Sequence, residues 1–434
     1  MALLLSFEQA PPISVPARFL FTAPLFGVLA GLLLAWQGGE ALATRWHPTT
    51  LALTHLLVAG LMLQAMVGAL FQLVPVVAGG NVWRPLPVAT LSHLLLAGGT
   101  LALVGGFLFQ LPWLFLLAAA LLGSGVLVVV AVVGFALLHA PGRGATLQAL
   151  RAAIVSLAVV AGFGCLLAVV LATDIGWPLM ETTDVHLSWG LGGWALALMS
   201  GVSYAVVPMF QLTPAYSRWL TRVLLPMIFL ALGLISLPLL VDGWAGLRPL
   251  GAILLLLAGG LFAGETLNLQ RRRRRKVIDT TYLYFRGAMV CALALVVAAL
   301  LLPWLPGLSL DPAAPVALGI LALVGVFAAA VNGMSYKIVP FLVWLHLQRL
   351  GGLKRLPPDI NSMIPERRAR GQLLAHFLSL AVLLPAPWIP QLARPGGLLL
   401  ALSCAWMWWN LGGALRIYRQ FKRQILAAAE SAES

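Results

Sequence analysis

Long apolar runs alternate with short polar segments along the whole chain. Each run is long enough to cross the roughly 30 Å of hydrocarbon in a bilayer as a helix. Helix is also the conformation that leaves no backbone group unpaired in lipid. The twelve predicted spans cover residues 18–36, 50–78, 86–109, 112–139, 151–172, 185–212, 218–241, 246–270, 282–303, 314–346, 370–389 and 396–418. The pattern therefore predicts an all-α, polytopic membrane protein with one membrane domain over residues 1–434.

The composition excludes several other classes of protein. Of the 434 residues, 61% are hydrophobic and 9% are charged, whereas ordinary globular domains have about 45–50% and about 25%. A soluble enzyme, a disordered protein and a secreted disulfide scaffold are thereby excluded. The three cysteines lie inside apolar runs and form no C-x-x-C motif. The first twenty residues lack the basic region and cleavage site of a signal peptide, so the first span is expected to be retained.

The net charge of +14 comes from basic residues placed between the apolar runs. With the N-terminus inside, the cytoplasmic segments hold 23 Lys and Arg residues, and the outer loops hold three, Arg45, Arg248 and Arg394. This asymmetry predicts cytoplasmic termini in a bacterial inner membrane. The basic run 271–275 is interpreted as a topology anchor, with binding of nucleic acid or anionic lipid as the alternative. We expect contact with the lipid bilayer and no nucleic-acid partner.

Three of the predicted spans end in the same motif, G-x-x-[FY]-x-x-V-P. The copies are Gly68-Ala-Leu-Phe-Gln-Leu-Val-Pro75, Gly201-Val-Ser-Tyr-Ala-Val-Val-Pro208 and Gly333-Met-Ser-Tyr-Lys-Ile-Val-Pro340. They are separated by 133 and 132 residues, and each interval contains four spans. A fixed period of this kind indicates an internal repeat. We predict three pseudo-threefold four-helix repeats, at 18–139, 151–270 and 282–418.

This plan resembles subunit I of the heme-copper oxidases and nitric oxide reductases. The stretch from His55 to Pro75 is similar to helix X of the C-family oxidases, and Val74-Pro75 followed by Gly79 is similar to the NnrS proteins of nitric oxide metabolism. The resemblance covers the whole chain in plan, but its motifs are confined to the second, sixth and tenth spans. It implies that these three helices line the pores and carry the metal ligands.

Two of the seven histidines are the main candidates for ligands. His55 and His186 both lie just inside the outer ends of apolar runs, where an ionisable residue is a functional hypothesis by default. His55 lies 20 residues before its repeat proline and His186 lies 22 before its own. Two residues correspond to about 200° around a helix, so the side chains leave their helices on nearly opposite faces of the common repeat frame. The resemblance implies that His55 points forward and His186 back, into a single pore.

Facing histidines predict a low-spin, bis-histidine heme b near the periplasmic face, one per chain, with His55 and His186 as the axial ligands of its iron. Two alternatives stay open. The histidines are ordinary helix-end residues bonded to backbone, or they bind copper or zinc together with the nearby carboxylates Asp174, Glu181 or Asp184. His93 and His376, in equivalent spans near the cytoplasmic side, are weaker candidates for a second heme or metal site, with buried hydrogen-bonded histidine as the alternative.

The departures from the family restrict the expected function. The span 218–241 contains no histidine, although the resemblance implies a pair of copper ligands of an oxidase there. The outer half of the span 314–346 also lacks the histidine pair that the family has on helix X. Reduction of oxygen or nitric oxide by the family mechanism is therefore not expected, and no catalytic residue is assigned. The leading hypothesis is a b-type cytochrome for electron transfer or for redox or nitric-oxide-related sensing, with acidic outer loops that dock a redox partner protein. The alternatives are a heme, copper or proton transporter or assembly factor, and a structural subunit of a respiratory complex or homo-oligomer.

Overall fold

A computed structural model of the chain describes residues 10–241, 243–274, 277–351 and 357–433. These residues form helices and loops and no β-strand. The main helices are α1 (Ser14–Gln37), α2 (Pro48–His55), α3 (Leu63–Leu73), α4 (Pro85–Phe109), α5 (Pro112–Leu138), α6 (Ala145–Thr173), α7 (Leu179–Ser188), α8 (Ala197–Gln211), α9 (Arg218–Ser236), α10 (Leu247–Arg271), α11 (Thr280–Leu301), α12 (Ala313–Ile320), α13 (Ala329–Gly351), α14 (Glu366–Leu383) and α15 (Ala393–Glu433).

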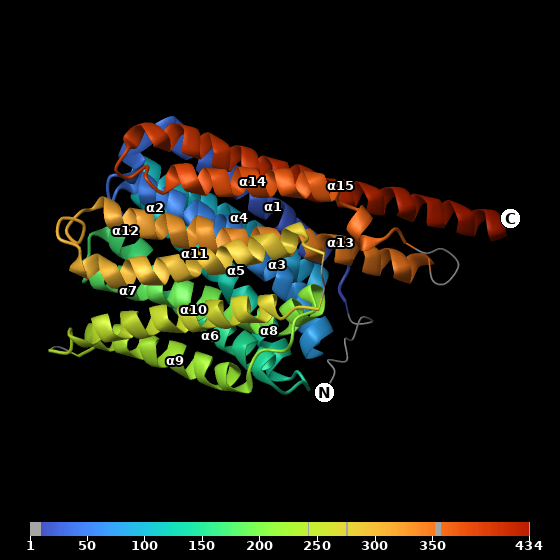
Figure 1. Cartoon of the computed structure of the whole chain (residues 1–434), viewed down its shortest axis with the longest axis horizontal. Coiled ribbons are helices and arrows are strands. Elements are labelled where there is room, and N and C mark those ends of the chain that lie inside the picture. The colour runs from blue at the N-terminus through green and yellow to red at the C-terminus, as the bar shows by residue number, and fades with distance from the viewer. Residues whose placement is uncertain (1–9, 242, 275–276, 352–356, 434) are drawn as a thin grey trace.

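Eleven helical stretches of the described chain are long and apolar enough to cross a membrane. They are Ser14–Leu42, Pro48–Ala78, Pro85–Phe109, Pro112–Leu138, Ala145–Thr173, Leu179–Gln211, Arg218–Leu239, Leu247–Arg271, Thr280–Trp304, Ala313–Leu350 and Pro390–Ala427. The chain is therefore a multi-pass helical membrane protein. The predicted span 370–389 corresponds to the 18-residue helix α14, whose first five residues include four charged ones and lower its hydropathy. Helix α14 nevertheless packs along α15 within the bundle (Figure 1).

Local sequence signals set the ends of many of these helices. Proline is the first residue of α2, α4 and α5, the position where its missing N–H costs nothing. Ser217 and Asp279 cap α9 and α11, because their side chains accept hydrogen bonds from the backbone N–H groups of Leu220 (3.3 Å) and Tyr282 (2.9 Å). These five helices thus begin where the sequence provides a proline or a capping side chain.

Three spans contain a π-helical segment in the middle. These segments are η3 (Leu56–Met62), η5 (Trp189–Leu196) and η8 (Leu321–Ala328). They begin at residues 56, 189 and 321, so their spacing of 133 and 132 residues equals that of the G-x-x-[FY]-x-x-V-P motif. Each segment joins a short outer helix to a longer one, as α2–η3–α3, α7–η5–α8 and α12–η8–α13. Wide turns of this kind occur often at functional sites.

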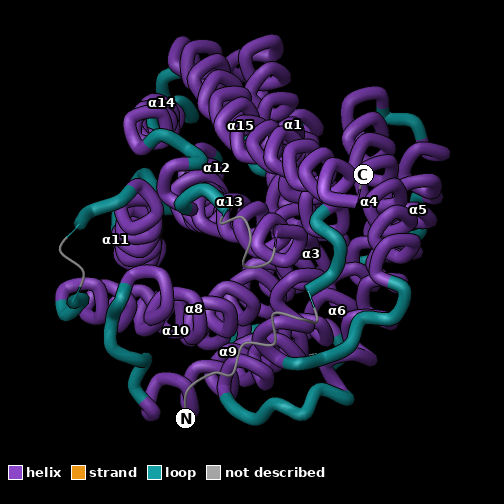
Figure 2. Tube along the Cα trace, turned by 90° about the vertical axis from the view of Figure 1, so that its right-hand side faces the viewer, coloured by secondary structure: helices purple, strands orange, loops and turns teal. Residues whose placement is uncertain are grey.

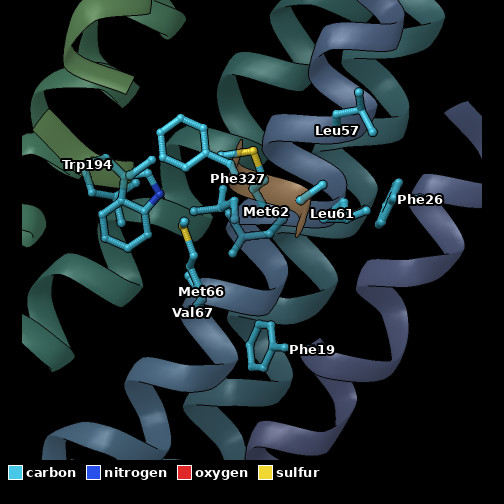
Figure 3. Packing of buried hydrophobic residues seen from close by; sticks show 14 of the residues in the cluster. Phe19, Phe26, Leu57, Leu61, Met62, Met66, Val67, Trp194 and Phe327 are labelled. Carbon is cyan, nitrogen blue, oxygen red and sulfur yellow. The ribbon is translucent and has the colours of Figure 1, made fainter. Parts of the chain in front are cut away.

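The same three spans form the interior of the bundle. Buried residues make up 78%, 67% and 72% of the most apolar windows in Pro48–Ala78, Leu179–Gln211 and Ala313–Leu350, against at most 50% in the other eight candidate spans. In a view along the helices, α3, α8 and α13 lie toward the middle (Figure 2). Their apolar side chains fill the space between them, with Met62, Met66, Trp194 and Phe327 in one cluster (Figure 3).

Helix α1 begins and α15 ends at the same end of the bundle, and α15 continues beyond the other helices there (Figure 1). We call the opposite end, where α2 and α7 begin, the histidine end. Parts of the basic segments used to predict the orientation lie outside the described residues, namely Arg275, Lys276 and residues 352–356.

Candidate functional site

His55 and His186 lie side by side near the histidine end of the bundle. Their ring centroids are 6.5 Å apart, and the ring planes are inclined by 24°. His55 is the last residue of α2 and directly precedes η3, whereas His186 lies in α7, three residues before η5. The structure therefore brings together the two histidines that the repeat register and the family resemblance together predict to face one another.

Both imidazole rings are held by a backbone carbonyl through the same nitrogen. Nδ1 of His55 lies 2.8 Å from the carbonyl oxygen of Leu51, and Nδ1 of His186 lies 3.0 Å from that of Val160. In the neutral ring, an N–H on Nδ1 leaves Nε2 with a free lone pair. Within the described part of the chain, neither Nε2 atom makes a hydrogen bond. Each ring therefore has an Nε2 lone pair that could bind a metal ion, and the two rings come from different helices. Both are in the tautomer that suits a metal ligand.

Residues of α4 and α6 fix the positions of the two rings. Phe107 stacks on His55 with centroids 5.2 Å apart, and Phe115 packs edge-on against Phe107. On the other side, Gly164 of α6 lies under His186, and a Cβ at that position would come within 3.1 Å of Cε1 of the ring. The absence of a side chain at residue 164 thus lets the ring lie directly on α6. No local pattern in the sequence indicates either contact.

The carboxylates near His186 do not complete a metal site. Asp184 forms an ion pair with Arg45, whose Nη1 lies 2.9 Å from Oδ1 of the carboxylate. Among the described residues, no group of three or more His, Cys, Asp and Glu side chains is arranged to hold a metal ion. A copper or zinc site of the kind that uses carboxylates as further ligands therefore finds no support in the geometry.

Two histidines without a third protein ligand fit a metal that brings its other donors with it. A porphyrin supplies four nitrogen donors to its iron and leaves the two axial positions to the protein. Metal–imidazole bonds of about 2.0–2.1 Å on both sides of one ion place the ring centroids about 6 Å apart, close to the observed 6.5 Å. The donor set of two imidazoles without a third protein ligand among the described residues, together with this ring separation, is compatible with the axial ligands of a heme.

His93 and His376 have different neighbours and form no common cluster. Nε2 of His93 lies 2.8 Å from the hydroxyl of Thr22 in α1. His376 is fully buried, and its Nε2 lies 3.2 Å from the carbonyl oxygen of Val324 in η8, while Asn332 donates to its Nδ1 at 3.4 Å. Both nitrogens of His376 are thus already in hydrogen bonds, as in an ordinary buried histidine.

Polar residues near His376 form a hydrogen-bonded network that no sequence motif predicts. Tyr284 and Tyr336 donate to the same oxygen, Oε1 of Gln372, at 2.6 and 3.0 Å. The amide nitrogen of Gln372 donates to Ser403, and that of Asn410 donates to Tyr336. The network joins α11, α13, α14 and α15. An amide in its centre makes it a poor relay for protons, so we interpret it as structural.

Comparison with protein-family models and with curated proteins finds no match for this chain. The likeness to heme-copper oxidase subunit I therefore stays a prediction made from the sequence. The pair formed by His55 and His186 is the feature of the described chain that points to a function.

Proposed function

We propose that this protein is a b-type cytochrome of the bacterial inner membrane that holds one heme between His55 and His186. The observation that carries the proposal is the pair of near-parallel rings at 6.5 Å, each with Nδ1 on a backbone carbonyl and without a third protein ligand. Its work is electron transfer, or redox or nitric-oxide-related sensing, because a bis-histidine heme has no open position for substrate.

The proposed architecture is twelve helices in three repeats, 18–139, 151–270 and 282–418, with both termini cytoplasmic. The equal spacing of the π-helical segments and the burial of the three motif helices support the repeats. The position of α14 alongside α15 supports a twelfth crossing. The 23-to-3 division of basic residues supports the orientation, which places the histidine end at the periplasmic face, where a redox partner protein would dock.

The heme would supply the one-electron chemistry, and the protein would supply its ligands and its surroundings. The carbonyl groups of Leu51 and Val160 orient the imidazoles and increase the basicity of Nε2. Phe107 and the apolar cluster of Met62 and Trp194 exclude water on the inner side. Such water-free surroundings have a low dielectric constant. This dielectric constant and the axial ligands are two of the means by which a protein sets the reduction potential of a heme.

A reduced-minus-oxidised absorbance spectrum of the purified protein, with a pyridine hemochrome assay, tests the proposal. We expect a b-type signal of about one heme per chain, unmoved by carbon monoxide and lost in His55→Ala and in His186→Ala. His139→Ala is the matched control, because that exposed histidine bonds only within its own helix and its variant should keep the signal. A colourless wild-type protein would overturn the cytochrome and favour the transporter or assembly factor. A shift with carbon monoxide would contradict six-coordination.

A further inference from the structure

A hollow lies on the outside of the bundle, between the start of α9 and the second half of α10. Its volume is about 360 Å³, within the range of about 300–1,000 Å³ of small-molecule sites. Gly260 and Gly264 line it one turn apart on α10, and a Cβ at residue 264 would meet no atom within 4 Å. Leu261 and the exposed ring of Trp219 are further apolar walls. The hollow therefore has room for an apolar chain on a surface that faces lipid.

The carboxylate of Glu265 also lines this hollow. It is the only acidic residue of the candidate span Leu247–Arg271, and it lies about 9 Å along the helix axis from the basic end of α10. Its Oε1 accepts a hydrogen bond from the backbone N–H of Ser217 at 3.3 Å. In the described part of the chain, Oε2 has no hydrogen-bond partner and Glu265 forms no ion pair. An ionisable residue within a membrane span is a functional hypothesis by default, and a cationic group would complete this one.

The face of α10 that contains the hollow changes from apolar to basic toward the end of the helix. Residues three, four and seven positions apart share one face of a helix, so Asn268 and Arg271 lie on the same face as Gly264. Both are exposed, and Arg271 lies about 10 Å beyond Gly264 along the axis. A phospholipid has the same order of apolar chain, polar linkage and phosphate. Arginine is a preferred partner of phosphate groups, so the order of groups along this face matches such a molecule.

We propose that this hollow binds phosphatidylethanolamine, with an acyl chain along Gly260 and Gly264 and the primary ammonium of the headgroup at Glu265. The ammonium donates an N–H to Oε2 of the carboxylate, which makes a charge-assisted hydrogen bond. The phosphate lies on the side of Arg271. This lipid site is separate from the pair of His55 and His186, and it does not depend on the proposed function.

A second copy of the chain is a less favourable occupant of the hollow. Gly260 and Gly264 have the G-x-x-x-G spacing that also brings helices together in membranes. A symmetric dimer through this face would bury the same surface of both copies, and with it two Glu265 carboxylates. No basic residue is among the described residues that line the hollow, and a buried charge without a partner is costly. A lipid ammonium supplies the missing cation.

Native mass spectrometry of the detergent-purified protein, titrated with phosphatidylethanolamine and with phosphatidylcholine of the same acyl chains, tests the proposal. Choline has the same charge but no N–H donor. The wild-type protein should therefore bind phosphatidylethanolamine about 10-fold more tightly, as expected for one charge-assisted hydrogen bond. Glu265→Gln should reduce this ratio to near one. Its amide oxygen can still accept the bond from Ser217, and an unchanged melting temperature checks that the variant folds.

A second pair of variants tests the place of the acyl chain. Gly264→Leu fills the hollow from its open side and should weaken binding of both lipids by about 10-fold or more, because apolar contact area is lost. Gly259→Leu is the matched control. A Cβ at residue 259 also meets no atom within 4 Å, but this glycine is not among the residues that line the hollow. Its lipid affinities should equal those of the wild type.

Three results would overturn the inference. Equal wild-type affinities for the two lipids, or a ratio that Glu265→Gln leaves unchanged, would refute recognition of the ammonium. Equal lipid binding by Gly264→Leu and Gly259→Leu would refute the hollow as the place of the chain. A wild-type dimer that Gly264→Leu dissociates and Gly259→Leu does not would show that the hollow is an interface between two copies.

Discussion

Replacing Gly164 by alanine tests the position of His186 on α6. The new Cβ would lie 3.1 Å from Cε1 and 3.7 Å from Nδ1 of the ring. Carbon atoms in contact prefer separations of about 3.5–4.0 Å, so the ring has to move outward from α6 by a few tenths of an ångström. That movement lengthens the 3.0 Å bond from Nδ1 to the carbonyl of Val160, because Val160 lies one turn before Gly164 on the same helix.

The expected loss of heme affinity follows from the steric contact of the new Cβ and from the weakened hydrogen bond of His186. Overpacking of a well-packed site costs about 1–3 kcal/mol, and a neutral hydrogen bond contributes about 0.5–1.5 kcal/mol. The ring relieves part of the contact by moving, so we expect Gly164→Ala to weaken heme binding by about 1–2 kcal/mol. This corresponds to an increase of about 5- to 30-fold in Kd. Titration of the heme-free protein, followed by absorbance, measures it.

Gly162→Ala is a matched control on the same helix. A Cβ at residue 162 meets no atom within 4 Å, so this variant gains the same helix propensity of about 1 kcal/mol without the contact. We expect its Kd to equal that of the wild type. If the two alanine variants bind heme with the same Kd, the ring of His186 is not a ligand held against α6, and the reasoning fails.

Two further predictions concern the polar network, and both are measured as thermal stability in detergent beside the heme content. Gln372→Leu removes the side-chain oxygen that accepts from Tyr284 and Tyr336. The Tyr336 hydroxyl then lacks an acceptor, and Tyr284 keeps only the 3.5 Å contact to the backbone oxygen of residue 372. This change should cost about 2–4 kcal/mol without loss of heme; an unchanged stability would contradict this account. His376→Phe removes the donor to the carbonyl of Val324 and should cost about 1–3 kcal/mol. Loss of heme from His376→Phe would show that this histidine has a role in the heme site.

The membrane-spanning helices were predictable where the apolar run and the helix cover nearly the same residues. The predicted runs 50–78, 185–212 and 314–346 correspond to Pro48–Ala78, Leu179–Gln211 and Ala313–Leu350, because the apolar stretch and the span coincide there. The last run, 396–418, was too short, since α15 continues to Glu433 through a basic segment that leaves the apolar part of the bundle. Helix α14 likewise begins before the predicted run 370–389, because its first turn is helical but charged.

The details of the candidate site were not predictable in the same way. Phe107, Gly164 and Arg45 contact the histidines or their helices across separations of 22 to 139 residues, and no local pattern encodes such contacts. Gly164 is one glycine among 43, and only the neighbouring ring distinguishes it from Gly162. Arg45 could be counted as a charge of a predicted outer loop, but its partner Asp184 lies 139 residues later in the chain.

The proximity of His55 and His186 was predictable from their register in the proposed repeat together with the family resemblance, which implied the direction of each side chain. A π-helical segment changes the angular positions of all residues that follow it in the helix. The direction of a side chain therefore cannot be calculated from ideal helix geometry across η3 or η5. Both π-helical segments begin at equivalent positions of the motif frame, however. The change in angle that they cause is therefore the same in both spans and cancels when the directions of His55 and His186 are compared. The third copy then limits the number of sites. The positions equivalent to His186 and His55 in that copy are Leu318 and Ile320, so only the space between the first two copies has a histidine on both sides, and one heme per chain is the stoichiometry to expect.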